Sequence, residues 1–247
     1  MRATKVEFRL RVAIITAIIT LGFWAPWIET WGIGERISLL EWLALGLSRM
    51  GLASFTFATP LAIVAGALIA AVGAVLRVWG TAYLGSFTVN HGQMKAGAVL
   101  ADGPYRYLRN PLYLGTWFMV AAMAFLMPAG GALFAVALLT AFLLRLILGE
   151  EAFLAGQLGE SYRSYLRAVP RLLPSFRTTL KPTGRKPRWL HSVLSELNPI
   201  GVFVILAALS WNYDNGLMVR AVIVSFGISL VAKALAPNNM HEASPAE

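Results

Sequence analysis

The sequence contains no cysteine and little charge. Its 247 residues include no Cys, and only 13% of them are Asp, Glu, Lys or Arg. The lack of thiols excludes disulfide bonds, thiolate zinc sites and cysteine nucleophiles. The charged fraction is too low for an ordinary soluble domain, for which about a quarter is usual. We therefore expect lipid rather than water around most of the chain.

Apolar residues make up 57% of the chain and gather in long runs. A membrane span needs roughly 20 apolar residues, so several spans fit in this length and leave polar loops for a site. We predict an all-α integral membrane protein with about six transmembrane helices. The predicted spans are residues 12–28, 55–78, 112–127, 132–148, 199–213 and 217–235.

Two features of these runs add detail. Only four residues join the third and fourth runs, which predicts a short central helical hairpin. Acidic and apolar residues mix at 29–49, as in an interfacial helix on the outer surface. We predict one membrane domain, divided into N-terminal spans (1–79), a core with the hairpin (80–176), and a basic loop with the C-terminal spans (177–247).

The Lys and Arg residues fall on one side of this arrangement. They concentrate at the N-terminus and at residues 80–110 and 149–196, whereas the turns at Pro128 and Asp214 carry none. Because short cytoplasmic loops are enriched in Lys and Arg, we predict that both termini are cytoplasmic. The net charge of +9 then needs no nucleic acid partner, and the basic segment after Pro170 is expected to rest on the headgroups of the lipid bilayer.

The hairpin brings the two basic stretches together at its open end. Residues 103–115 read GPYRYLRNPLYLG, where the Gly-Pro pair predicts a turn and Pro111 suits the first turn of a helix. The free N–H groups of that helix end would suit a carboxylate. The alternative is that Arg106 and Arg109 are only interfacial anchors, with the nearby tyrosines as interface aromatics.

Three charged residues mark the other end of the hairpin. Arg145 lies in the last turns of the apolar run, and Glu150 and Glu151 are predicted to follow at the helix C-terminus. Two carboxylates there oppose the helix dipole and repel each other, so a compensating cation is expected. Arg145 or a ligand ammonium group would supply it, and a structural ion pair is the alternative. Together the two helix ends match a zwitterionic amino-acid headgroup.

These segments resemble a known family. Residues 103–115, then the Glu-Glu pair at 150–151, the GESYRSY run at 159–165, and two Val-Pro or Leu-Pro pairs after it resemble the isoprenylcysteine carboxyl methyltransferase family and its phospholipid methyltransferase relatives. The resemblance covers about residues 80–176. Two positions depart from the family pattern, since Asn110 stands where many members carry His and Ala168 where a basic residue is common.

The resemblance implies that S-adenosyl-L-methionine binds between the two segments, and no metal is required. The cofactor-binding residues that it predicts are His91, Gln93, Tyr105, Arg109, Asn110, Pro111, Tyr113, Glu150, Glu151 and Tyr162. Tyr162 and Tyr165 lie three apart and are expected to share a helical face over the pocket. The predicted catalytic residues are Arg145, Glu151 and Arg163, with the two arginines orienting an acidic acceptor.

The reaction that the resemblance implies is carboxyl O-methylation of a prenylcysteine-like or other lipophilic acceptor, which enters from the membrane. Positioning and desolvation are the main tasks, because a sulfonium donor carries its own leaving group. A lipid amine N-methyltransferase is the alternative, and it would need a base such as Glu150, Glu151 or His91. A sterol-type membrane reductase is the alternative from another class, and a non-enzymatic scaffold ranks last.

Overall fold

The computed structural model describes residues 2–24, 37–84, 99–177, 180–212 and 214–235. Within these ranges the chain forms helices, with one isolated bridge between Ser38 and Pro128 and no strand. The all-α prediction is therefore confirmed for the described residues.

The helices follow the predicted apolar runs. In the first half they are α1 (Lys5–Arg9), α2 (Arg11–Phe23), α4 (Leu39–Arg49) and α5 (Phe55–Leu84). A 3-10 turn, η1 (Gly103–Arg106), precedes the hairpin of α7 (Pro111–Ala124) and α8 (Ala129–Ala168). The chain continues with α9 (Trp189–Ser195), α10 (Leu197–Leu209), η2 (Ser210–Asn212) and α11 (Asn215–Leu235).

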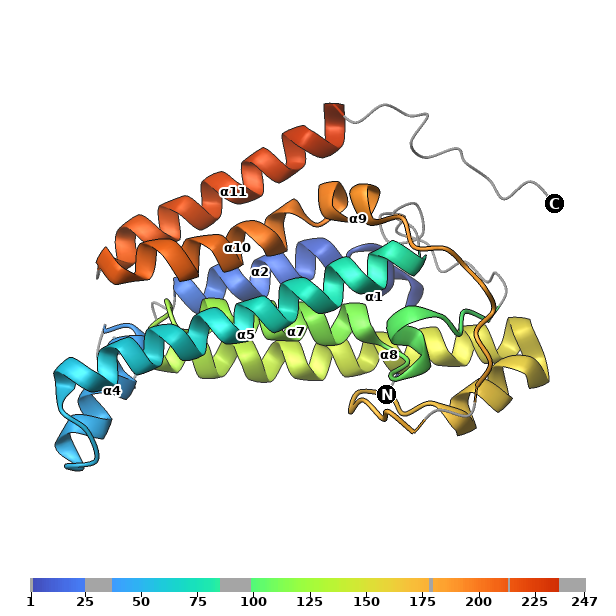
Figure 1. Cartoon of the computed structure of the whole chain (residues 1–247), viewed down its shortest axis with the longest axis horizontal. Helices are drawn as coiled ribbons and strands as arrows, with labels where there is room; N and C mark the ends of the chain where they lie inside the picture. The colour runs from blue at the N-terminus through green and yellow to red at the C-terminus, as the bar shows by residue number, and fades with distance from the viewer. Residues whose placement is uncertain (1, 25–36, 85–98, 178–179, 213, 236–247) are drawn as a thin grey trace.

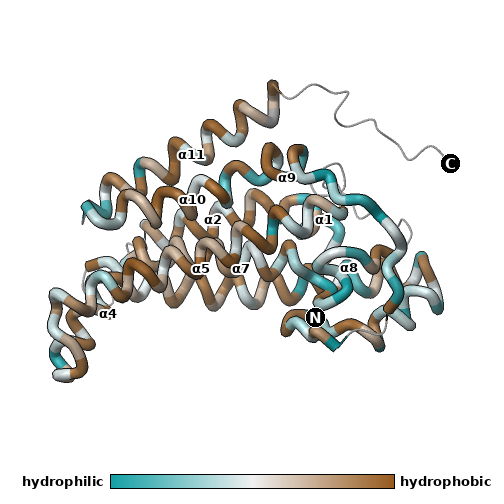
Figure 2. Tube along the Cα trace, viewed as in Figure 1, coloured by the Kyte–Doolittle hydropathy of each residue, from teal (hydrophilic) through white to brown (hydrophobic). Residues whose placement is uncertain are grey.

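The long helices lie side by side in one elongated bundle (Figure 1). Helix α4 lies at one end, and the extended chain between α8 and α9 lies at the other. Hydrophilic residues concentrate at this second end, whereas the middle of the bundle is mostly hydrophobic (Figure 2). The two segments that carry the family resemblance, residues 103–115 and 150–165, meet at this polar end.

Small residues let α5 and α7 approach closely. A Cβ added at Gly73 would meet Met119 Sδ at 2.7 Å and the backbone oxygen of Gly115 at 3.1 Å. Ala70 and Ala74 on the same helix are also buried in the main core. Since lipid tails are as apolar as side chains, such close van der Waals packing is what favours association of membrane helices.

Three described helices are long and apolar enough to cross a membrane: Phe55–Leu84, Ala129–Ala168 and Asn215–Ala232. Helices α9 and α10 form a fourth candidate, bent by 71°. The predicted runs in α2 and α7 are helical, but these helices have only 13 and 14 residues. A membrane protein is thus supported, and the count of six spans stays a prediction.

A surface helix was predicted at residues 29–49. Residues 37–49 of this range are described, and most of them belong to α4.

The bend between α9 and α10 is fastened to α5 by a buried ion pair. Arg77 Nε donates to Glu196 Oε2 at 2.6 Å, and Arg77 Nη2 donates to Oε1 at 3.0 Å. The Thr81 hydroxyl also donates to Glu196, at 2.7 Å. Burial of a carboxylate requires such partners, because an unpaired charge in the interior is very costly.

One predicted helix end is wrong. Helix α8 does not stop before Glu150 and Glu151 but continues to Ala168, so the two carboxylates lie within a helix and do not oppose its C-terminal dipole. The direction changes only at Gly159, whose φ of 58° and ψ of −133° are not helical. These angles are essentially restricted to glycine. Beyond this turn the last residues of α8 fold back over the polar end (Figure 1).

Candidate active site

The loop before α7 is shaped by glycine and proline. Gly103 has a φ of 54°, and a Cβ there would collide with the ring of Tyr83. Pro111 occupies the first position of α7, as predicted, and Asn110 is the N-cap residue. The side chain of Asn110 makes no capping hydrogen bond. It is therefore available for contacts across the site.

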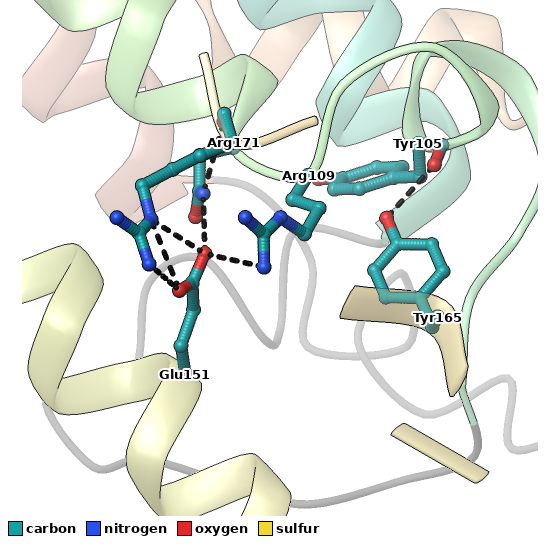
Figure 3. Close-up of polar contacts among 6 residues, drawn as sticks. Tyr105, Arg109, Glu151, Tyr165 and Arg171 are labelled. Atoms are coloured by element: carbon teal, nitrogen blue, oxygen red, sulfur yellow. Dashed lines mark hydrogen bonds and ion pairs between the residues drawn. The ribbon is translucent and has the colours of Figure 1, made fainter. Parts of the chain in front are cut away.

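Glu151 is the centre of the polar cluster in Figure 3, which we call the Glu151 cluster (Arg109, Asn110, Glu151 and Arg171). Arg171 donates to Glu151 Oε2 from Nη2 at 2.8 Å and from Nε at 3.1 Å. Arg109 Nη1 lies 3.4 Å from Oε1, and Asn110 Nδ2 donates to the same oxygen at 3.2 Å. Asn110 Nδ2 also lies 3.2 Å from the Arg171 carbonyl oxygen.

The charges in this cluster do not cancel. Glu151 is only 6% exposed and faces two guanidinium groups. The hydrogen bond to Glu151 raises the pKa of Arg171 above its usual value, while partial burial acts in the opposite direction. Charge-assisted hydrogen bonds of this kind are about twice as strong as neutral ones. One positive charge is left over, so the cluster suits an added anionic group.

Two tyrosines close one side of the site, as Figure 3 shows for Tyr165. Tyr162 and Tyr165 share a face of α8, with ring centroids 5.7 Å apart, which confirms the predicted shared face. The Tyr165 hydroxyl donates to the Tyr105 carbonyl oxygen at 2.8 Å. Tyr105 itself is buried, and burial is the main reason that its pKa lies well above 10, with Tyr165 as the next cause. Its phenol therefore stays protonated.

Several buried polar atoms around the site have no hydrogen-bond partner among the described residues. They include the Tyr105 hydroxyl, Arg106 Nε and Arg109 Nε. An unsatisfied buried polar group costs about 1–3 kcal/mol, so such atoms need an explanation. A polar ligand that accepts hydrogen bonds from these donors would supply one.

The chain after α8 crosses the site as an extended segment, which we call the strap (residues 169–177 and 180–188). Backbone hydrogen bonds with N···O distances of 2.9 Å join Arg109 to Pro170, Ser175 to Tyr107, and Arg188 to Ala82. The Tyr107 ring also contacts Phe176, with centroids 5.5 Å apart. The strap therefore lies beside the loop before α7 and ends beside α5.

Asp102 fastens the far part of the strap. Its carboxylate accepts hydrogen bonds from the Thr183 hydroxyl and from the backbone N–H groups of Gly184 and Arg185, both at 3.2 Å. Burial alone would raise the pKa of Asp102, but these hydrogen bonds, above all that from Thr183, bring it below its ordinary value of 3.8. Asp102 is therefore ionised at neutral pH.

Glu150 faces a different set of residues from Glu151. The Tyr113 hydroxyl on α7 donates to Glu150 Oε2 at 2.7 Å. Successive helical residues are separated by about 100° around the axis, so neighbours cannot share one facing surface. Glu151 therefore contacts the loop and the strap, whereas Glu150 contacts α7, and the cofactor-binding role expected for both stays a prediction.

The two arginines predicted to act in catalysis lie elsewhere. Arg145 pairs with Glu7 on α1 at 2.8 Å, not with Glu150 or Glu151, so its predicted compensating contact is wrong. Arg163 is largely exposed and lies 4.0 Å from Glu160, one turn away on its own helix. Neither belongs to the Glu151 cluster, and a catalytic role for them stays a prediction.

Some residues of the site fall outside the sequence prediction or outside the described ranges. His91 and Gln93, predicted to contact the cofactor, are not among the described residues. Arg171 and Asp102 were missed, although both belong to the site. The sequence places Arg171 among many basic residues, and its position next to Pro170 is the signal that distinguishes it. Asp102 is the sole acid between residues 80 and 110.

The fold and site together define a helical membrane protein with a charged, partly unsatisfied site at one end of the bundle. Residues 61–161 match the family model of phospholipid methyltransferases. This match supports the resemblance seen in the sequence.

A curated relative supports the same conclusion. Over 70 residues the chain is 41% identical to a methanethiol S-methyltransferase of Crocosphaera subtropica. This match covers 28% of the chain and 27% of that protein. No solved structure matches the chain.

Proposed function

We propose that this protein is a membrane methyltransferase that takes its methyl group from S-adenosyl-L-methionine and acts on a lipophilic acceptor. The observation that carries the proposal is the Glu151 cluster, which joins the two halves of the family motif through a buried, hydrogen-bonded carboxylate. The comparisons support methyl transfer over the reductase alternative, since both point to methyltransferases.

The residues of the cluster suit the amino-acid part of this cofactor. Glu151 would receive the ammonium group. The carboxylate would be received by Arg109, whose Nε lacks a partner among the described residues. Arg106 Nε is a further donor without a partner among the described residues at the same end of the bundle. The bound cofactor supplies a methyl group on a sulfonium, so these residues mainly orient it and exclude water.

The chemical class of the methyl acceptor is a separate part of the proposal. A prenylcysteine-like carboxylate was expected to be oriented by Arg145 and Arg163, and both lie outside the Glu151 cluster. The relative from Crocosphaera subtropica is named for methylation of a sulfur atom in a thiol. A lipophilic thiol therefore joins the carboxylate and the lipid amine as a candidate acceptor for this chain.

Calorimetric titration of the detergent-purified protein with S-adenosyl-L-methionine and its demethylated product tests the cofactor. Glu151→Gln removes the buried charge with little change of shape, and Glu160→Gln is the matched control, because Glu160 is an exposed carboxylate of the same helix. We expect the wild type and Glu160→Gln to bind equally and Glu151→Gln to bind at least tenfold more weakly, which corresponds to about 1.4 kcal/mol. Absence of binding by folded wild-type protein at millimolar cofactor would contradict the proposal.

A further inference from the structure

Glu150 sits in an environment built from three separate parts of the chain. It belongs to α8, and its Oε2 accepts the 2.7 Å hydrogen bond from Tyr113 on α7. Arg11, the first residue of α2, is among the charges that act on both Glu150 and Tyr113. The carboxylate thus faces the interior between α2, α7 and α8, away from the Glu151 cluster.

The N-terminal segment is fixed against this part of α8. Glu7 pairs with Arg145, and the backbone N–H of Ala3 donates to the Arg145 carbonyl oxygen at 3.0 Å. The absence of a side chain at Gly149 allows the close approach, since a Cβ there would lie 3.2 Å from the Ala3 oxygen. The backbone directly before Glu150 is therefore packed against the N-terminus.

A buried hydroxyl without a partner among the described residues lies close enough to Glu150 to interact with its charge. Tyr105 is 7% exposed, and its hydroxyl has no hydrogen-bond partner among the described residues. Glu150 is one of the charges that act on this phenol. Buried hydroxyls are nearly always hydrogen-bonded in folded proteins, so a ligand atom is expected there.

We propose that Glu150 is the general base of the reaction and that the acceptor carries a proton on its nucleophilic atom, as a thiol or an amine does. This inference rests on the proposed function and narrows its acceptor class. Glu150 Oε1 would receive the proton, because Oε2 already accepts from Tyr113. The Tyr105 hydroxyl would contact the acceptor and hold it in place. A carboxylate acceptor needs no base and would be repelled by the charge of Glu150.

The atoms and electrons of this step balance with the cofactor as the methyl donor. A proton moves from the S–H or N–H group of the acceptor to Glu150 Oε1. The acceptor lone pair forms a bond to the methyl carbon as the bond from that carbon to the sulfonium sulfur breaks, and the electron pair of the broken bond remains on a neutral thioether. The proton on Glu150 then passes to water.

The test compares Glu150→Gln with Glu151→Gln, the same change one residue apart. The acceptors are dodecanethiol, dodecylamine and dodecanoate, which share one chain and differ in the reacting group. We expect Glu150→Gln to keep its affinity for S-adenosyl-L-methionine within threefold but to lose at least 100-fold in kcat with the acceptor that the wild type methylates, the usual size of a general-base effect. Glu151→Gln should instead lose cofactor affinity.

Binding gives a readout that does not depend on turnover. With S-adenosylhomocysteine present, calorimetry is used to measure dodecylammonium and dodecanoate binding below their micelle concentrations. Glu150→Gln should weaken dodecylammonium binding at least tenfold and should not weaken dodecanoate binding. Tyr113→Phe removes the hydroxyl that fixes the carboxylate and should lower kcat relative to the wild type without changing cofactor affinity. It serves as the second variant if Glu150→Gln does not fold, and an unchanged kcat would then count against the role of Glu150.

The outcomes separate the two proposals. Failure of the wild type to bind the cofactor would overturn the proposed function. A wild type that binds cofactor and methylates dodecanoate but neither of the other acceptors, or a Glu150→Gln variant with unchanged kcat, would overturn the role of Glu150 alone. Selection between dodecanethiol and dodecylamine by the wild type identifies which proton-bearing acceptor the site takes.

Discussion

Buried carboxylates connect segments that are distant in the sequence. Glu151 joins α8 to the loop before α7, Asp102 joins that loop to the strap, and Glu196 joins the α9–α10 bend to α5. Each is satisfied by several donors, as a buried charge must be. Loss of any one carboxylate is expected to loosen a connection rather than remove a helix.

Asp102→Asn should loosen the strap. The carboxylate holds the N–H groups of Gly184 and Arg185, and hydrogen bonds to a charged group contribute about 1.5–3 kcal/mol each. Hydrogen exchange at these two amides should become at least tenfold faster in the variant. Asp214→Asn is the control, because Asp214 is an exposed acid that accepts one backbone hydrogen bond, from Leu217, at the start of α11.

The same carboxylate predicts a pH dependence of the strap. The folded-state pKa of Asp102 lies below its ordinary value of 3.8, so its contribution to stability is fully present at pH values above 3.8. It is lost as the pH falls below 3.8 through the folded-state pKa. The protection factors of the Gly184 and Arg185 amides, which correct for the intrinsic pH dependence of exchange, should therefore fall in this acidic window in the wild type and change little in Asp102→Asn. An equal fall in both proteins would contradict the assignment.

Two of the three partners of Glu151 were predicted from the sequence and the third was not, for a physical reason. Arg109 and Asn110 lie in a recognisable run, so their proximity to Glu151 followed from the family resemblance. Arg171 lies in a basic segment where charge alone does not distinguish a buried partner from a surface one. The Glu7 contact of Arg145 joins residues 138 positions apart, and no local pattern reports such a pairing.

At the scale of helices, apolar runs predicted positions well and ends less well. The hairpin, α5 and α11 fall where the hydropathy places them, because a span must be apolar along its length. The end of α8 was missed, because charged residues end an apolar run without ending a helix. A glycine with a positive φ marks the actual change of direction, at Gly159.

Gly159→Ala should destabilise the end of α8. A side chain at its φ of 58° and ψ of −133° is strained by about 1–3 kcal/mol, whatever space surrounds it. We expect a lower melting temperature and weaker cofactor binding, because Tyr162 and Tyr165 follow the turn. Gly156→Ala is the matched control on the same helix, since a Cβ there meets no atom within 4 Å. It should leave stability unchanged or raise it by up to about 1 kcal/mol, through higher helix propensity. Equal effects of both changes would contradict a special role for the turn.

At the scale of the whole molecule, polar and basic residues distinguish one end of the bundle from the other (Figure 2). The bias of Lys and Arg predicts that this end faces the cytoplasm, together with both termini. That orientation agrees with a polar cofactor reaching the Glu151 cluster from water and a lipophilic acceptor arriving from the bilayer.

The lack of cysteine makes this orientation directly testable. Gly156→Cys and Gly46→Cys each introduce a single thiol where a side chain meets no neighbour within 4 Å. In sealed cells a membrane-impermeant maleimide should label Gly46→Cys and should label Gly156→Cys only after permeabilisation. The reverse pattern would show that the charged end faces outward.

A contact near the start of α8 fixes the rotation of this helix about its own axis. Gly131 packs against the backbone of Gly22, where any side chain would collide with the Gly22 carbonyl oxygen, and the two carboxylates lie about five turns further along the same helix. One residue inserted between Gly131 and Glu150 would rotate both carboxylates by about 100°, and seven would nearly restore their direction but displace them by roughly 10 Å. Relatives that keep this chemistry should therefore vary freely in the length of the strap but show no insertions or deletions in this part of α8.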